Sequence, residues 1–258
     1  MSLGLRNFQL EELRMLKAVS EKLNNAGVGF YLIGGSCIGA LRHQGFIPWD
    51  DDVDICMPLE DMLRFKKEFK SEKLKYNDID TDKDYCYPFS HISHVDTYQK
   101  DGWFINYGIC IDVYPLIEVP SSQVEASELI NMGEPLLNKR YTYMKWNSRW
   151  RRHLPFKFNL PGYRNSIKKY RDFLFNILSK KGGHSYFFIT GPLRNFERHT
   201  FEFNPFDEMI ELEFEGKNVM CPAKYHDLLS KIYGDYMQLP PEEKRYNHMA
   251  EHIDFGKY

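Results

Sequence analysis

Two spacings of hydrophobic residues dominate the first half of the chain. In residues 9–25 apolar side chains recur every three or four positions, which predicts an amphipathic helix that ends at Gly27. Residues 28–35 and 53–58 are short runs rich in β-branched and aromatic side chains, bounded by glycine or proline, which predicts buried strands. Further segments continue this alternation, with strands expected at 74–79, 87–96 and 103–116 and helices at 36–43 and 59–69.

The second half of the chain is expected to be mostly helical. Its helical patterns lie at 121–138, 173–178 and 223–234. One hairpin is predicted at 209–222, around a Glu-Gly-Lys turn. This order of elements is typical of an α+β (α/β-like) fold. We therefore predict a catalytic core over residues 1–120 and a mostly helical region over 121–258, packed on the core as one unit.

Composition and charge exclude several classes of protein. The chain has 258 residues, of which 43% are hydrophobic and 27% charged, so it can bury a substantial core. A formal net charge of −2 gives no overall attraction for nucleic acid, and no such partner is expected. The five scattered cysteines favour a reduced, cytoplasmic protein over a disulfide framework or a zinc site. No apolar run reaches the roughly 18–20 residues of a membrane span.

The segment GFIPWDDDVDICMP at 45–58 places four carboxylates within five positions. Like charges this close repel one another unless a positive partner offsets them. Because residues i and i+2 of a strand share a face, Asp52 and Asp54 would point outward together, and Val53 and Ile55 would pack inward. Paired carboxylates on a strand suit Mg²⁺, which takes oxygen ligands and completes its shell with substrate phosphates. The alternative is an exposed edge strand with solvated acids.

The turn before this strand suggests a phosphate site. Gly34 and Gly35 end a predicted strand, and Ser36 begins the next helix at or near its N-cap. Backbone N–H groups at a helix N-terminus bind phosphate, and glycines let a phosphate approach the backbone closely. The alternative is an ordinary strand-to-helix turn. The two glycines therefore indicate a phosphate site only in combination with the acid pair that follows them.

A third acid, Asp112, lies late in a predicted strand with apolar residues on both sides. A carboxylate buried there costs free energy unless it is paired or bound to a metal. If that strand neighbours residues 53–57, Asp112 completes a three-carboxylate site. It would then act as metal ligand, as general base on an attacking hydroxyl, or as both. The alternative is an aspartate that caps the turn near Pro115.

These motifs resemble the LicD family. LIGGSCIGALRHQGFIPWDDDVDICMP matches the signature of that family without gaps, and FINYGICIDVYPL and YGDYMQLPPEEKRYNH resemble it less strongly. The resemblance implies a nucleotidyltransferase-like core with a mixed β-sheet. It implies transfer of a phospho-alcohol such as phosphocholine from a CDP-activated donor to a sugar hydroxyl of a surface glycan; the related fukutin group uses CDP-ribitol. It also implies metal ligation by Asp52, Asp54 and Asp112, and donor phosphates at residues 34–36.

Residues close to these motifs are further candidates. Arg42 is a candidate to bind a donor phosphate or to pair with Asp50 or Asp51 and offset their repulsion. We expect Asp50 to be structural and Asp51 to support the metal ligands. Trp49 is expected to wedge its loop into the core or to stack on a base or sugar. The remaining candidates for the donor or acceptor site, each with a structural alternative, are His91, His94, Thr97 and His248.

Residues 138–171 carry eleven Lys or Arg side chains and no Asp or Glu. Such a segment suits contact with phosphates or with an anionic membrane surface, and its interleaved aromatic side chains can stack on sugars. The alternative is a solvated helical face whose aromatic side chains pack inward. We expect recognition of the acceptor here, and with it a position in the cytoplasm at the inner face of the membrane.

The sequence therefore predicts a metal-dependent phosphotransferase. The expected donor is a CDP-alcohol, the acceptor is a glycan or its lipid-linked precursor, and the leaving group is CMP. Mg²⁺ or Mn²⁺ is the expected cofactor. Two alternatives stay open: a nucleotidyltransferase that adds NMP to a small molecule or protein, and a non-catalytic module that binds a nucleotide or glycan. The motifs do not identify the alcohol.

Overall fold

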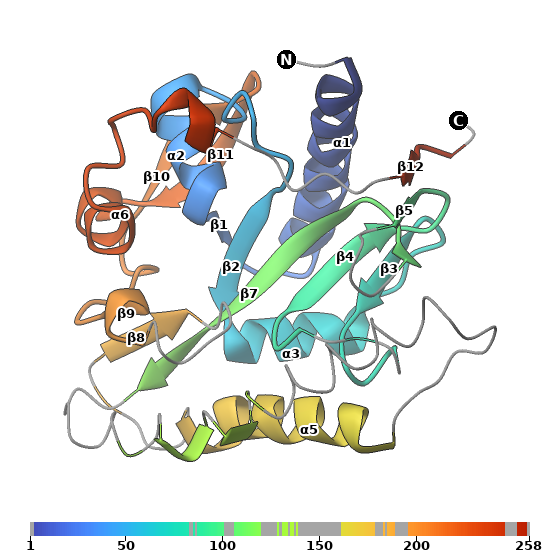
Figure 1. The fold of residues 1–258 in the computed structure, drawn as a ribbon, viewed down its shortest axis with the longest axis vertical. Coiled ribbons are helices and arrows are strands. Elements are labelled where there is room, and N and C mark those ends of the chain that lie inside the picture. The colour runs from blue at the N-terminus through green and yellow to red at the C-terminus, as the bar shows by residue number, and fades with distance from the viewer. Residues whose placement is uncertain are drawn as a thin grey trace.

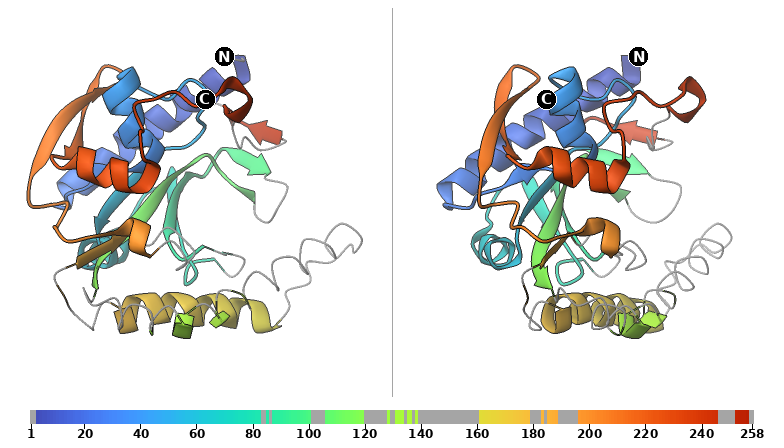
Figure 2. Two further views of the ribbon diagram at one scale, coloured as in Figure 1. Left: turned by 60° about the vertical axis from the view of Figure 1, so that its left-hand side comes forward. Right: turned by 90° about the vertical axis from the view of Figure 1, so that its left-hand side faces the viewer.

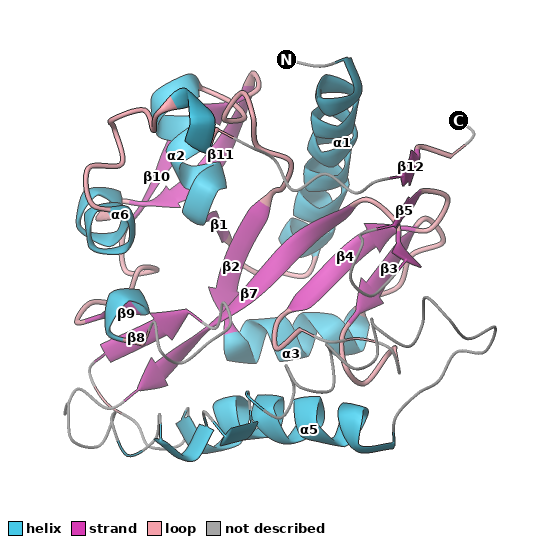
Figure 3. Cartoon of the chain, in the orientation of Figure 1, coloured by secondary structure: helices cyan, strands magenta, loops and turns pink. Residues whose placement is uncertain are grey.

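A mixed β-sheet forms the centre of the molecule, with helices packed against it (Figures 1 and 3). The computed structural model describes residues 3–82, 85, 87–100, 106–119, 128, 131–133, 135–136, 138, 161–178, 183, 185–188, 196–245 and 252–256. The central strands, in order across the sheet, are β1 (Tyr31–Leu32), β2 (Asp54–Pro58), β7 (Cys110–Val119), β4 (Ser90–His94) and β3 (Leu74–Asn77). The predicted α+β class with a mixed sheet is confirmed.

The pairing of β2 with β7 decides where the acids meet. These two strands run parallel, whereas the strands that pair with them on either side, β1 and β4, run antiparallel. The register of the parallel pair sets Asp54 opposite Asp112. The sequence left open whether the strand of Asp112 neighbours residues 53–57. The structure shows that it does, because β7 pairs directly with β2.

Two helices cover one face of this sheet. Helix α1 (Leu3–Asn25) contacts β7 and β4, and helix α3 (Leu59–Glu68) contacts β2 and β7. The side chains of β2 and β7 that are fully buried in the core include Ile55, Ile111 and Val113. Asp54 and Asp112 alternate with them along the strands and are only half-buried. The predicted division into an apolar inner face and an acidic outer face is confirmed.

Helix α1 differs from its predicted pattern in one respect. Its fully buried apolar side chains are Leu5, Phe8, Met15, Leu16, Val19 and Leu23, whereas Leu10 is 38% exposed. Glu12, expected on the solvent face, is only 1% exposed. The reason is helical geometry: Glu12 lies four residues after Phe8 and four before Leu16, so it falls within the buried stripe.

The second half of the chain adds strands to the same core. Strand β8 (Ser185–Phe188) pairs with the end of β7 and with β9 (Thr200–Phe201). The predicted hairpin is confirmed as β10 (Met209–Phe214) and β11 (Lys217–Pro222), and it is followed by helix α6 (Tyr225–Tyr233). The hairpin and α6 lie beside helix α2 (Gly34–His43), as two further views show (Figure 2).

The remaining described elements lie at the edges of the molecule. They are β5 (Tyr98–Lys100), β6 (Asn106–Tyr107), β12 (His252–Asp254), helix α5 (Pro161–Asp172), the π-helical turns Phe173–Leu178 and the short 3₁₀ helices Glu197–His199 and Glu242–Lys244. The helix expected at 121–138 lies mostly outside the described residues. None of the helices in the described ranges is long and apolar enough to cross a membrane.

Candidate active site

The predicted acids converge where β2 and β7 begin. Asp54 and Asp112 occupy opposite positions of the parallel pair, and the N–H of Asp112 donates a hydrogen bond to the carbonyl oxygen of Val53 at 3.0 Å. Asp52 precedes β2 and is exposed to solvent. Asp52 and Asp112 are both close enough to Asp54 to raise the pKa of its carboxyl group. The structure therefore brings all three acids together.

Helix α1 holds the acidic loop in place. The side-chain amide of Gln9 donates a hydrogen bond to the carbonyl oxygen of Asp50 at 2.8 Å. The carboxylate of Asp50 in turn lies against Gly35: a β-carbon on this glycine would be 2.6 Å from Oδ2 of Asp50. An oxygen anion at the first turn of α2 is favoured by the helix dipole. This position agrees with the structural role expected for Asp50.

The acids perturb one another strongly. Burial, and then the charge of Asp52, raise the pKa of Asp50 and that of Asp112 to about 8 each. Burial and the charges of Asp52 and Asp112 raise the pKa of Asp54 well above its usual range. Oδ1 of Asp54 is buried without a hydrogen-bond partner. Carboxyl groups held together in this way, with one oxygen unpaired, fit a divalent cation.

Glu12 is a fifth acid at this site that the sequence analysis missed. Its carboxyl group is buried, and Oε2 has no hydrogen-bond partner. Burial, followed by the charges of Asp52 and Asp51, raises its pKa well above the usual range. Burial and the neighbouring acids therefore both disfavour the charged form of Glu12. The position of Glu12 in the sequence could have indicated this, because a carboxyl group in the apolar stripe of a helix is buried at a cost in free energy.

A second set of possible metal ligands surrounds Asp112. Three possible ligand atoms lie within 4.8 Å of one another, one each from His91, Cys110 and Asp112. Nε2 of His91 lies 3.1 Å from Oδ1 of Asp112, and the hydroxyl of Tyr114 donates a hydrogen bond to Oδ2 at 3.1 Å. Burial lowers the pKa of His91 to about 3, so its imidazole is neutral. Both ligand sets share Asp112, so a cation in either place could contact this residue.

The glycine turn adjoins these acids. Helix α2 begins at Gly34 with Ile33 as its N-cap residue, so the N-cap position predicted for Ser36 was wrong. The Ser36 hydroxyl instead accepts a hydrogen bond from the N–H of Asp54 at 2.9 Å. Gly34 has a φ of 57°, and a β-carbon on it would lie 3.2 Å from Oδ2 of Asp54 and 3.2 Å from the hydroxyl of Tyr233. The turn thus places backbone beside the acids, and a β-carbon at Gly34 would be in tight contact with Asp54 and Tyr233.

Gly34→Ala is expected to lower activity far more than it lowers stability. A left-handed φ costs a non-glycine residue about 1–2 kcal/mol, and the added methyl group would push on Asp54 and Tyr233. Gly27→Ala is the matched control, because Gly27 has a φ of 62° and nothing within 4 Å of its β-position. Thermal unfolding should show a similar loss for both variants, and an activity assay a loss for Gly34→Ala alone. Equal activities of the two variants would contradict this account.

Arg42 and Trp49 lie on the rim, away from the carboxylates. The guanidinium of Arg42 donates hydrogen bonds to the carbonyl oxygens of Tyr236 at 2.6 Å and Gln238 at 3.4 Å, which ties α2 to the segment after α6. Trp49 is partly buried against the core, and the guanidinium of Arg245 lies over its ring at 5.2 Å. The contacts of Arg42 are to backbone, and its binding of a donor phosphate stays a prediction.

Other predicted residues fall elsewhere. His94 lines a separate cavity of about 610 Å³ beside α1, away from His91. Thr97 is buried in a turn, where its hydroxyl accepts from the N–H of Ile109 at 2.8 Å and donates to the carbonyl of His94 at 3.1 Å. His248 lies outside the described residues, and so does most of the basic segment 138–171. The roles predicted for His94, Thr97, His248 and this segment stay predictions.

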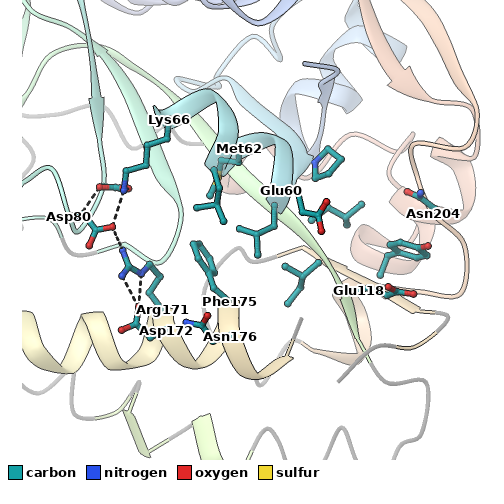
Figure 4. A pocket seen from close by; sticks show the side chains of 17 residues that line it. Glu60, Met62, Lys66, Asp80, Glu118, Arg171, Asp172, Phe175, Asn176 and Asn204 are labelled. Atoms are coloured by element: carbon teal, nitrogen blue, oxygen red, sulfur yellow. Dashed lines mark hydrogen bonds and ion pairs between the residues drawn. The ribbon is translucent and has the colours of Figure 1, made fainter. Parts of the chain in front are cut away.

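A cavity of about 710 Å³ between α3 and α5 is separate from the acids (Figure 4). Arg171, which belongs to the basic segment, forms an ion pair with Asp80 at 2.6 Å at one end of this cavity. Lys66 of α3 also pairs with Asp80, at 2.8 Å, so the two cations tie α5 to α3 through one carboxylate (Figure 4). Among the described residues, none of the individual candidates for the acid and donor sites lines this cavity.

Comparison with known proteins agrees with this site. Residues 27–125 match the family described as LicD/FKTN/FKRP, nucleotidyltransferase domain. The chain is 28% identical to lipopolysaccharide cholinephosphotransferase LicD of Haemophilus influenzae, over 95% of this chain and 96% of that protein. It is 55% identical to human ribitol 5-phosphate transferase FKRP, but only over 16% of this chain and 8% of that protein. Residues 27–125, which hold the three acids, are therefore similar to the nucleotidyltransferase domain of this family, as the resemblance of the acidic motif predicted.

Proposed function

We propose that this protein is an enzyme that transfers a phospho-alcohol from a CDP-activated donor to a hydroxyl of a glycan or its lipid-linked precursor, releasing CMP. The observation that carries the proposal is the pairing of Asp54 with Asp112 across two parallel strands, with Asp52 and the Gly34 turn beside them. The names of the relatives, a cholinephosphotransferase acting on lipopolysaccharide and a ribitol phosphate transferase, support the reaction class.

Asp52, Asp54 and Asp112 are the residues that we expect to hold Mg²⁺ or Mn²⁺. The buried unpaired oxygen of Asp54 and the raised pKa values of the acids fit such a cation, and oxygen ligands suit both ions better than the thiol of Cys110 does. When bound, the cation would neutralise charge on the donor diphosphate and polarise the phosphorus–oxygen bond to CMP.

The protein's own groups would complete the reaction. The hydroxyl of Tyr114 holds Oδ2 of Asp112, and Nε2 of His91 lies 3.1 Å from Oδ1, so the carboxylate is fixed in position. As general base it would accept the proton of the acceptor hydroxyl. The acceptor oxygen then attacks phosphorus from the side opposite the leaving group. A new phosphorus–oxygen bond forms, the bond to CMP breaks, and the proton passes to Asp112. N–H groups of residues 34–36 face the donor phosphates and need no reorganisation during the step.

An aromatic cluster beside Asp112 favours choline as the alcohol of the donor. The rings of Tyr87 and Phe89 lie 4.9 and 5.4 Å from the imidazole of His91, and Phe89 lies 4.4 Å from Tyr114. Tyr87 and Tyr114 are half-buried, so their rings reach the surface. Aromatic faces beside carboxylates attract a quaternary ammonium group, and a neutral His91 does not repel it. Ribitol would instead need several hydrogen-bonding groups.

Release of CMP from CDP-choline, CDP-ribitol and CDP-glycerol, with Mg²⁺ and candidate glycan acceptors, tests this proposal. We expect kcat/KM for CDP-choline to exceed the others by about 2-fold to 30-fold, since a cation over aromatic rings gains about 0.5–2 kcal/mol. Tyr87→Leu should reduce this preference, and Tyr87→Phe, which keeps the aromatic face, should retain it. Release of pyrophosphate from an NTP, without CMP release from any of the three donors, would instead identify a nucleotidyltransferase.

A further inference from the structure

Tyr233 is the first residue of the segment YGDYMQLPPEEKRYNH, to which the sequence analysis assigned no role apart from His248. It is the last residue of α6, a helix fixed to the core by the buried side chains Leu228, Leu229 and Ile232. Helix α6 packs against α2, whose first turn adjoins the acids. The Tyr233 side chain therefore reaches the site from a rigid element that lies far along the sequence from both acidic strands.

The hydroxyl of Tyr233 lies close to the β-position of Gly34. It lies 3.2 Å from the point that a β-carbon on Gly34 would occupy, and Oδ2 of Asp54 lies at the same distance from that point. The space above Gly34 is thus bounded by a carboxylate on one side and a phenol on the other. Tyr233 as a residue is 47% exposed, so part of it is accessible from solvent.

The hydroxyl is also available as a donor. In the part of the chain that the structure describes, it makes no hydrogen bond, although carboxylates lie close by. A phenol has an ordinary pKa of about 10, so a tyrosine hydroxyl is a neutral hydrogen-bond donor at physiological pH. A neutral O–H group beside expected metal ligands matches a phosphate oxygen that arrives with the cation.

We propose that Tyr233 is a donor-binding residue whose hydroxyl donates a hydrogen bond to a phosphate oxygen of the donor diphosphate, in the space above Gly34. This inference rests on the proposed function, because it assigns Tyr233 to the donor of that reaction. The chemical class that it recognises is a diphosphate bound together with a divalent cation. The remaining exposed part of the ring would form a wall of the same space.

The test compares binding of pyrophosphate, in the presence of Mg²⁺, to the wild type, Tyr233→Phe and Tyr225→Phe. Tyr225 lies at the start of the same helix and serves as the matched control. A hydrogen bond to a charged group is worth enough to weaken pyrophosphate binding about 10-fold to 100-fold in Tyr233→Phe. Titration with Mg²⁺ alone should give the same affinity in all three proteins, and so should their melting temperatures. KM for the CDP-alcohol should rise in parallel in Tyr233→Phe.

The outcomes separate this inference from the function on which it rests. Turnover by the wild type with unchanged pyrophosphate binding in Tyr233→Phe would overturn the role of Tyr233 alone. Weakened pyrophosphate binding in Tyr233→Phe, with no turnover of any CDP-alcohol by the wild type, would support the diphosphate contact and refute the proposed function. A loss of Mg²⁺ affinity without pyrophosphate would show that Tyr233 positions Asp54 instead, and it would overturn the inference. Absence of pyrophosphate binding to the wild type would do the same.

Discussion

Asp54→Asn is expected to lower kcat/KM by about 10³-fold or more and to leave the free energy of unfolding unchanged or higher. The loss follows because a cation that stabilises the transition state by several kcal/mol would lose a ligand. Stability should not fall with it. Burial and the charges of Asp52 and Asp112 raise the pKa of Asp54 and so disfavour its charged form in the metal-free protein, and asparagine is neutral with nearly the same shape as the protonated acid.

Asp52→Asn should behave in the same way, with a larger gain in stability. The charge of Asp52 raises the pKa of Asp50, Asp54 and Asp112 more than any other neighbouring charge does, so its removal relieves repulsion at all three. Asp227→Asn, an exposed acid on α6, is the control for loss of a surface charge. Initial rates and chemical unfolding curves measure both effects. Near-normal turnover in either site variant would refute the assigned roles.

The second large effect expected is a fall in the stability of the metal-free protein as pH rises from about 6.5 to 8. Asp50 and Asp112 have pKa values of about 8 in the folded protein, against the ordinary value of 3.8 for an unfolded chain. Between these values the folded state holds protons that the unfolded state has released. Stability is therefore full below about pH 4 and declines as pH approaches 8.

Two other titrating groups restrict the pH range in which this fall in stability can be measured to its upper part. His91 has a pKa of about 3 when folded, so the unfolded state binds its proton below about pH 6.5, and this term opposes the acids there. Asp80, with a pKa of about 2, acts only below about pH 4. Above pH 6.5 the acids remain, and two of them should cost roughly 2 kcal/mol by pH 8, or about 5 °C in melting temperature.

Thermal unfolding in EDTA and in Mg²⁺ measures this effect. Mg²⁺ binds the ionised acids and competes with their protons, so it should raise the melting temperature more at pH 8 than at pH 6.5. In EDTA, Asp112→Asn should show a smaller fall between these pH values, because one of the two titrating groups is gone. A melting temperature that stays constant or rises from pH 6.5 to 8 without metal would contradict the account.

Local patterns in the sequence were sufficient to predict the acidic face. Side chains alternate along any strand, so the spacing of Asp52 and Asp54 and the apolar character of Val53 and Ile55 predicted which residues face outward. The helix at α1, the hairpin at 209–222 and the helix before Gly234 were predicted for the same reason, because periodicity and turn residues act over a few positions.

Contacts between segments that are far apart in the sequence decided which residues surround the acids. The sequence identified Asp112 as a candidate, but only the parallel register of β2 and β7 sets it opposite Asp54. Glu12 and Tyr233 lie on helices at the two ends of the chain, and their side chains reach the acids only because α1 and α6 pack against opposite parts of the core. The sequence by itself determined the acids and the face that they share. The tertiary structure decided their partners, because register and helix packing depend on the whole core.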